Sequence, residues 1–227
     1  MSPFDLPRFS VWFAAAVSLF TLLLWCVMPT DALVHLVEEG QLVENLTLVF
    51  YAITIALLIV LPIPHFTRKT RWAIIIALLA MMAREADLHK YIDHISMLKL
   101  RFWTGSLPGL DKVYAFLSLA PIIVACLYLV IRFAGPLWQG IKAGKNYAVT
   151  VTTFICLIFL TNGIDRSLGI IKEMLGWHAP EWLVALQTSQ EEFLELALPC
   201  LALVAVLQYR RQMVSSLAIL ERRRVGQ

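Results

Sequence analysis

Long apolar runs recur along this chain, and short segments rich in charged residues separate them. Each run is close to the ~20 residues that carry a helix across a hydrocarbon core of ~30 Å. Because backbone polar groups in lipid must be satisfied within the segment, the pattern predicts helices. The six predicted spans cover residues 10–29, 44–64, 72–91, 113–133, 147–165 and 191–209. We therefore expect an all-α, polytopic transmembrane helix bundle that forms a single integral membrane domain over residues 1–227.

The composition agrees with lipid as the surrounding solvent. Hydrophobic residues make up 59% of the chain and charged residues 15%, and the mean hydropathy is +0.74. Soluble domains have about half apolar and about a quarter charged residues, so this class is excluded. The four cysteines fall inside apolar runs, which indicates small core side chains rather than a zinc site or a disulfide framework. They are Cys26, Cys126, Cys156 and Cys200.

Charged residues are distributed unequally between alternate loops. With the N-terminus placed inside, the inner segments hold twelve bases and two acids, and the outer segments hold seven bases and fourteen acids. This bias predicts that both termini are cytoplasmic, with a basic tail over residues 210–227. The size and the charge bias suit a bacterial inner membrane, with membrane lipids as expected partners. The outer connections 92–112 and 166–190 are predicted to lie on the membrane surface as short amphipathic pieces.

The third apolar run is too short to cross a membrane alone. Its uninterrupted part, residues 72–83, has twelve residues and covers about 18 Å. To complete the span, the helix must carry charged residues into the outer part of the bilayer. Glu85 then lies about 21 Å from the inner charge of Arg71, and Glu195 lies about 22 Å from Arg210. The sequence therefore predicts two glutamates at a similar depth.

These acids predict a polar pocket that opens outward. An ionised carboxylate in lipid costs at least about 2–3 kcal/mol, so such groups face the bundle interior and meet a base, a proton or a metal. Glu44 in the second span and Asp165 in the fifth lie somewhat nearer the outer edge. The other predicted pocket residues are Arg84, Lys90, Arg166, Glu192 and Tyr51. The candidate catalytic carboxylates are Glu85, Glu195 and Glu44.

A candidate metal site lies on the third predicted helix. Glu85, His89 and Asp93 follow one another at intervals of four residues. If the helix continues past the membrane surface, this spacing places three potential ligands on one stripe. Such a set suits zinc or another divalent metal, which would activate a bound water as nucleophile. The competing interpretation is an ion-pair network in which Arg84 and Lys90 join the acids and lock the outer ends of the helices together.

Three classes of function follow from this pattern. The first is a metal-dependent membrane hydrolase or transferase that acts on a lipid or an outer-face substrate, and the mixture of histidine with carboxylates at one depth favours it. The second is a small proton- or ion-coupled transporter. The third is a non-catalytic assembly subunit whose polar cluster is a structural ion-pair network. Motifs of serine hydrolases, zincins, P-loops and dinucleotide sites are absent from the sequence, and the basic tail gives no support for nucleic-acid binding.

Overall fold

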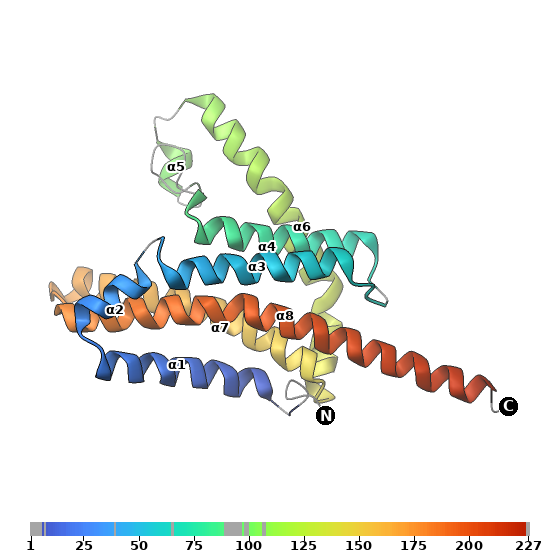
Figure 1. Cartoon of the computed structure of the whole chain (residues 1–227). Helices are drawn as coiled ribbons and strands as arrows, with labels where there is room; N and C mark the ends of the chain where they lie inside the picture. Colours follow the sequence, from blue (N-terminus) through green and yellow to red (C-terminus); the bar gives the residue numbers. More distant parts are fainter. Residues whose placement is uncertain are drawn as a thin grey trace. The chain divides into compact units, whose positions relative to one another are not determined.

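The computed structural model describes residues 6, 8–38, 40–64, 66–88, 97, 100–105 and 108–225, with backbone alone for residues 100, 101 and 217–225. The described part is helical and contains no strand, which confirms the predicted all-α fold (Figure 1). Its helices are α1 (Phe9–Val27), α2 (Thr30–Val37), α3 (Leu42–Val60), α4 (Arg68–Glu85), α5 (Leu100–Thr104), α6 (Gly109–Lys142), α7 (Asn146–Leu175) and α8 (Glu181–Val225).

The chain divides into two compact units. Unit 1 comprises Met1–Phe50 and Trp138–Gln227, and unit 2 comprises Tyr51–Leu137. The boundaries fall inside α3 and α6, so each unit contains part of these two helices. The expected single domain stays a prediction.

In unit 1, helices α1, α7 and α8 pack side by side, and α2 packs on α8 (Figure 1). Ser10 near the start of α1 meets Thr153 near the start of α7, with 3.2 Å between the two hydroxyl oxygens. At the other end of α1, the indole N–H of Trp25 donates to the carbonyl of Trp182 at the start of α8, at 3.0 Å. Helices α1 and α7 therefore run in the same direction, and α8 runs back between their ends.

Two further contacts fix the antiparallel pairing of α7 and α8. The Thr150 hydroxyl donates to Oε1 of Gln208 at 2.8 Å. The Gln187 amide donates to the backbone carbonyls of Ile164 and Asp165 at 2.5 and 2.6 Å. The starts of α1 and α7 and the Gln208 region of α8 thus share one end of unit 1.

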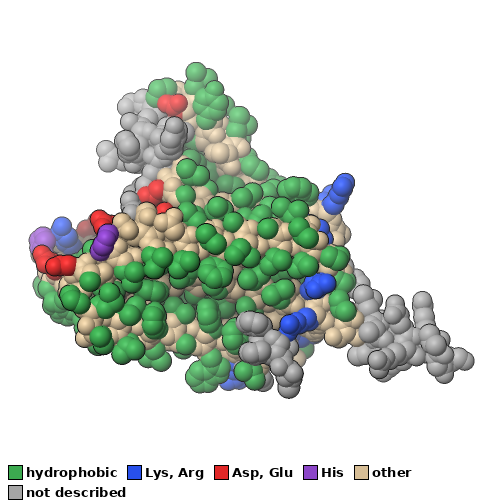
Figure 2. Space-filling model, viewed as in Figure 1, with side chains coloured by type: hydrophobic (Ala, Val, Ile, Leu, Met, Phe, Trp, Pro, Cys, Tyr) green, Lys and Arg blue, Asp and Glu red, His purple; other side chains and the backbone are tan. Residues whose placement is uncertain are grey.

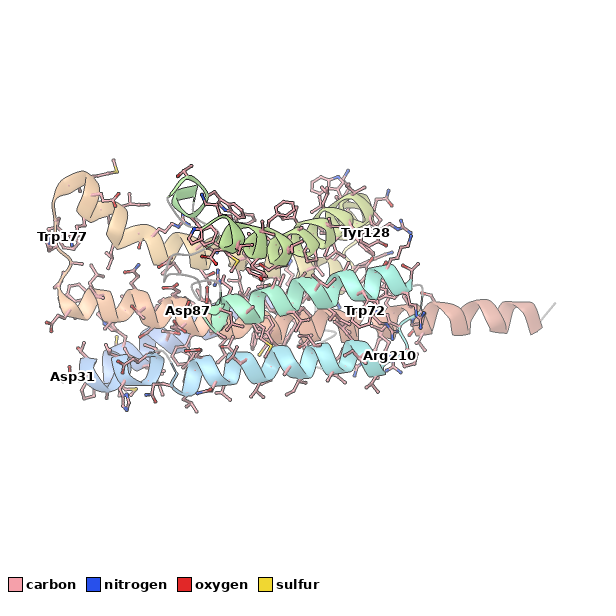
Figure 3. The ribbon with its side chains drawn as sticks, turned by 90° about the horizontal axis from the view of Figure 1, so that it is seen from above. Asp31, Trp72, Asp87, Tyr128, Trp177 and Arg210 are labelled. Atoms are coloured by element: carbon pink, nitrogen blue, oxygen red, sulfur yellow. The ribbon has the colours of Figure 1, made fainter. Side chains whose placement is uncertain are left out.

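The two ends of unit 1 differ in charge. The basic end holds Arg8, Lys142, Lys145, Arg210 and Arg211. The opposite end holds Asp31, His35, Glu38, Lys172, Glu173, His178 and Glu181. Figure 2 shows hydrophobic side chains over the helices between the ends, and Figure 3 places Asp31 and Trp177 at the end away from Arg210. A spanning bundle that obeys the positive-inside bias has this arrangement.

Unit 2 is organised around polar contacts of α4. The Thr67 hydroxyl accepts from the Thr70 backbone N–H at 3.2 Å and caps the start of α4. Thr70 also pairs with the Tyr128 hydroxyl of α6 at 2.9 Å. The guanidinium of Arg71 donates to the carbonyl of Ile59 at 3.2 Å and to that of Leu61 at 3.1 Å. Both carbonyls lie at the C-terminal end of α3. Positive charge at a helix C-terminus is favourable, so Arg71 stabilises the turn from α3 to α4.

Five segments of the described chain are long and apolar enough to cross a membrane. They are Phe9–Val27, Thr30–Val60, Gly109–Lys142, Asn146–Leu175 and Glu181–Ser216. This agrees with the predicted transmembrane character of the protein. Helix α4, which corresponds to the third predicted span, is not among them, because its 18 residues include five charged ones. The charged residues of α4 are Arg68, Lys69, Arg71, Arg84 and Glu85.

Several predicted helix boundaries are wrong. Segment 166–190 was expected to lie on the membrane surface, whereas α7 continues to Leu175 and α8 already begins at Glu181. The end of α7 is set by Gly176, whose φ of 64° and N–H bond to the Lys172 carbonyl form a left-handed C-cap. Helices α7 and α8 therefore extend beyond the predicted spans 147–165 and 191–209, and the positions of these spans in a membrane stay predictions. The short helix α2 was not expected either.

The third predicted span ends earlier than expected. The span was placed at residues 72–91, but α4 ends at Glu85, and Asp87 follows with a φ of 51°. A residue in the left-handed region breaks the helical repeat. Glu85 is the last residue of α4, and because His89 and Asp93 lie outside the described residues, their placement on one stripe with Glu85 stays a prediction.

Candidate functional site

The most deeply buried acid of unit 1 is Glu195 on α8. Its side chain is only 7% exposed. It lies about 21 Å along the helix axis from Glu181 and about 22 Å from Arg210, at 1.5 Å per residue. Leu194 and Leu198 near it on α8 are buried, at 2% exposure each, and Glu191 and Glu192, one turn before it, are half-buried. The structure therefore places this carboxyl well inside the candidate span Glu181–Ser216.

Pro199 follows Glu195 after one helical turn, inside the uninterrupted helix α8. Proline has no backbone N–H, so it cannot donate the bond that an ordinary residue would give to the carbonyl of Glu195. Such positions in membrane helices are tolerated where neighbouring groups satisfy the freed carbonyl. The carboxyl and the altered backbone thus occur within the same turn of α8.

Neutral polar side chains join the three long helices of unit 1 in the same interior. Ser18 of α1 donates to Oε1 of Gln190 at 3.1 Å, and Nε2 of Gln190 donates back to the Ser18 carbonyl at 2.9 Å. The pairs Ser10 with Thr153 and Thr150 with Gln208, described above, lie closer to the basic end. Contacts of this kind hold membrane helices together where lipid offers no hydrophobic driving force.

The interior also contains a hydroxyl with no partner in the described part of the chain. Ser189 on α8 is fully buried, and its Oγ makes no hydrogen bond with any described group. Ser189 precedes Gln190, which bonds to α1. Ser189, Gln190 and Gln208 were not among the predicted site residues, although a glutamine at the end of an apolar run, as at Gln208, is a signal that could have identified it.

Glu44, a predicted catalytic carboxylate, has a local structural contact. It is half-buried in the first turn of α3, and its Oε2 accepts from the Gly40 N–H at 2.6 Å. Gly40 has a φ of 79° and begins the turn before the helix. A glutamate in this position that reaches back to a preceding N–H is similar to half of a capping box. Its assignment to a pocket stays a prediction.

The other predicted pocket residues that the structure describes lie on helices of both units. Asp165 and Arg166 are exposed on α7, and Glu192 is half-buried on α8. In unit 2, Tyr51 is 1% exposed on α3. Arg84 and Glu85 are half-buried at the end of α4, together with Asp87 just after it. His89, Lys90 and Asp93 lie outside the described residues.

The described residues contain no group of three or more histidine, cysteine or acidic side chains placed to hold a metal ion. Within unit 1, the arrangement offers one buried carboxyl, a turn of helix with a missing donor, and a series of neutral hydrogen-bonding pairs. The carboxyl can bind a proton or a cation, and the hydrogen-bonding pairs can hold the helices in register.

Comparison of the chain with protein families, with curated proteins and with solved structures finds no match.

Proposed function

We propose that this protein is a six-span integral membrane carrier in which the carboxyl of Glu195 takes up and releases a proton or a cation during transport. The observation that carries the proposal is the burial of Glu195 inside a candidate span. Acids at such depth are costly in their ionised form and commonly belong to ion pathways and proton relays. Pro199, one turn further along α8, removes one helical hydrogen bond at Glu195 while α8 stays continuous.

The proposed six crossings are supported by the directions of the helices in unit 1. Helices α1 and α7 run the same way, and each crossing of a membrane reverses the direction of the chain. If α1 is the first crossing, α7 must be an odd-numbered one. With α3 and α6 between them, α7 would be the fourth crossing, and it becomes the fifth only if α4 also crosses. This parity favours α4 as a span despite its charged ends, with Arg8 and Arg210 on one side, which the charge bias assigns to the cytoplasm.

Single cysteines in the two connections that flank α4 test this topology. In a variant without the four native cysteines, Thr67→Cys and Asp87→Cys are expected to react with a membrane-impermeant maleimide from opposite sides of sealed vesicles. Reaction of both cysteines from one side would show that α4 does not cross, and it would overturn the six-span proposal.

Proton flux tests the role of Glu195. The purified protein is reconstituted into liposomes that contain a pH-sensitive dye, and an acid pulse is applied with and without a panel of Na⁺, K⁺ and small organic cations. We expect Glu195→Gln to reduce cation-dependent proton flux by at least ~10-fold. The matched control is Glu181→Gln, which removes an exposed carboxylate at the start of the same helix. Equal flux in Glu195→Gln and in the native protein would refute the carrier, as would the absence of flux from the native protein.

A metal-dependent hydrolase or transferase is the second candidate. The observation that favours it is the half-burial of Arg84, Glu85 and Asp87 at the end of α4, next in sequence to His89. This candidate predicts about one divalent metal per chain, lost in the Glu85→Ala/His89→Ala variant. Elemental analysis of the purified protein checks it, and a metal-free native protein would end it.

A further inference from the structure

A polar cavity opens at the basic end of unit 1. It has a volume of about 560 Å³ and lies where the first turn of α7 faces the part of α8 beyond Gln208. The polar side chains that line it come from Asn146, Tyr147, Gln208, Arg211, Gln212 and Ser215. A volume of this size is within the range of sites for small ligands.

The side chains of the cavity favour an anion. Arg211 brings a permanent positive charge and a planar set of N–H donors that match phosphate oxygens. Gln212 and Ser215 add neutral donors, and among the described side chains no acidic residue lines the cavity. A cation would find no opposite charge among these side chains, whereas a phosphodiester would find both charge and hydrogen bonds.

Two contacts fix the walls of the cavity. The hydroxyl of Thr150 holds Gln208 at 2.8 Å, and Gln208 is 5% exposed. The rings of Tyr147 and Tyr209 meet edge to face with their centroids 5.2 Å apart. The site therefore rests on packed helices rather than on a loop, which limits the entropy lost on binding.

The surroundings of the cavity favour a lipid headgroup over a free anion. The cavity lies beside Arg210 at the end of the apolar part of α8, where a spanning helix meets the headgroups. Val214 also lines the cavity and is 48% exposed, so it offers an apolar contact next to the polar donors. A phospholipid presents this combination of phosphate and hydrocarbon.

We infer that this cavity binds the phosphodiester headgroup of an anionic phospholipid, with Arg211 as the principal contact of the phosphate. The inference is independent of the proposed carrier activity, because lipid binding is measured without flux.

Native mass spectrometry of the full chain in detergent tests the inference, with dioleoyl phosphatidylglycerol as the probe. Arg211→Gln is expected to weaken its binding by about 10-fold or more, the effect of losing one charge-assisted hydrogen bond. The matched control is Arg210→Gln, which removes the same charge from the adjacent residue outside the cavity lining and is expected to change binding by less than ~3-fold. Unchanged thermal midpoints of both variants will show that they are folded.

Dioleoyl phosphatidylcholine and inorganic phosphate distinguish the sources of the ligand. We expect phosphatidylcholine to bind at least ~10-fold more weakly, and phosphate at equal concentration not to displace phosphatidylglycerol. Equal losses in Arg211→Gln and Arg210→Gln would overturn the site, since they would indicate attraction by the whole basic end. Displacement by phosphate would overturn the lipid assignment and indicate a site for a free anion.

Discussion

Gly140 allows the closest approach between α6 and α7, and filling its position tests this part of the fold. A Cβ atom at residue 140 would lie 2.8 Å from Cβ of Ala148 and 3.4 Å from the hydroxyl oxygen of Tyr147. Carbon atoms in favourable contact are ~3.5–4.0 Å apart, so the helices would have to separate locally by about 1 Å. Ala148 is fully buried and has no rotamer that could relieve the contact.

The net effect of Gly140→Ala is the difference between two terms. Overpacking of a buried contact costs about 1–3 kcal/mol. Replacement of glycine by alanine inside a helix stabilises by about 1 kcal/mol. We therefore expect Gly140→Ala to lower the free energy of unfolding by about 0–2 kcal/mol.

A control in α7 separates the two terms. Gly169 on α7 has no neighbouring atom within 4 Å of an added Cβ, so Gly169→Ala should stabilise by about 1 kcal/mol through helix propensity alone. The double variant Gly140→Ala/Ala148→Gly removes the overlap, and it should recover most of the stability lost in Gly140→Ala.

Unfolding in mixed micelles by titration with dodecyl sulfate, followed by tryptophan fluorescence, measures these free energies. If Gly140→Ala stabilises as much as Gly169→Ala, and Ala148→Gly shows no coupling to it, then α6 and α7 do not meet at Gly140. That result would refute the described packing of the α6–α7 hairpin.

Three further predictions test other contacts by the same titration. The double-mutant cycle of Thr150→Val and Gln208→Leu should give a coupling energy of about 0.6 kcal/mol and at most ~1.7 kcal/mol, the range for hydrogen bonds between membrane helices; a coupling of zero would contradict the pair. Arg71→Leu should destabilise by about 1–3 kcal/mol through loss of two charged bonds to carbonyls, whereas Lys69→Leu, at an exposed position, should change stability by less than ~0.5 kcal/mol. Glu44→Ala should cost about 0.5–1.5 kcal/mol as a lost cap while proteoliposome proton flux stays at the native level; loss of that flux would return Glu44 to the functional site.

The helical class of the fold could be predicted because lipid leaves a long apolar run no other way to satisfy its backbone. The helix ends could not be predicted from hydropathy, since the charged residues Arg166, Lys172 and Glu173 lie within α7. Gly176, with Lys172 one turn before it, was a better signal for the end of α7 than the loss of hydrophobicity. At α4, the left-handed conformation of Asp87 is a local backbone choice that the apolar pattern does not encode.

The candidate site was predicted less completely than the fold. Glu195, which depth counting singled out, is buried in the described structure, and its depth in a membrane stays a prediction. The pairs Ser18 with Gln190 and Thr150 with Gln208 depend on which helices are neighbours, and a single sequence does not specify neighbours. Glu44 accepts a hydrogen bond from Gly40, four residues before it, and its assignment to a pocket stays a prediction.

Helix α4 carries charged residues at both ends, and this bears on its proposed crossing of the membrane. Parity favours α4 as a crossing, yet only the twelve residues from Trp72 to Ala83 are uninterrupted by charge, which covers about 18 Å of the ~30 Å core. At its start, the guanidinium of Arg71 is held by the carbonyls of Ile59 and Leu61, and at its end Glu85 is half-buried. Arg71 and Glu85 are therefore partly covered by protein, whereas Arg68 and Lys69 are exposed. If α4 crosses the membrane as proposed, it needs its neighbours in place to cover these charges, whereas the five apolar segments are hydrophobic enough to cross without such help.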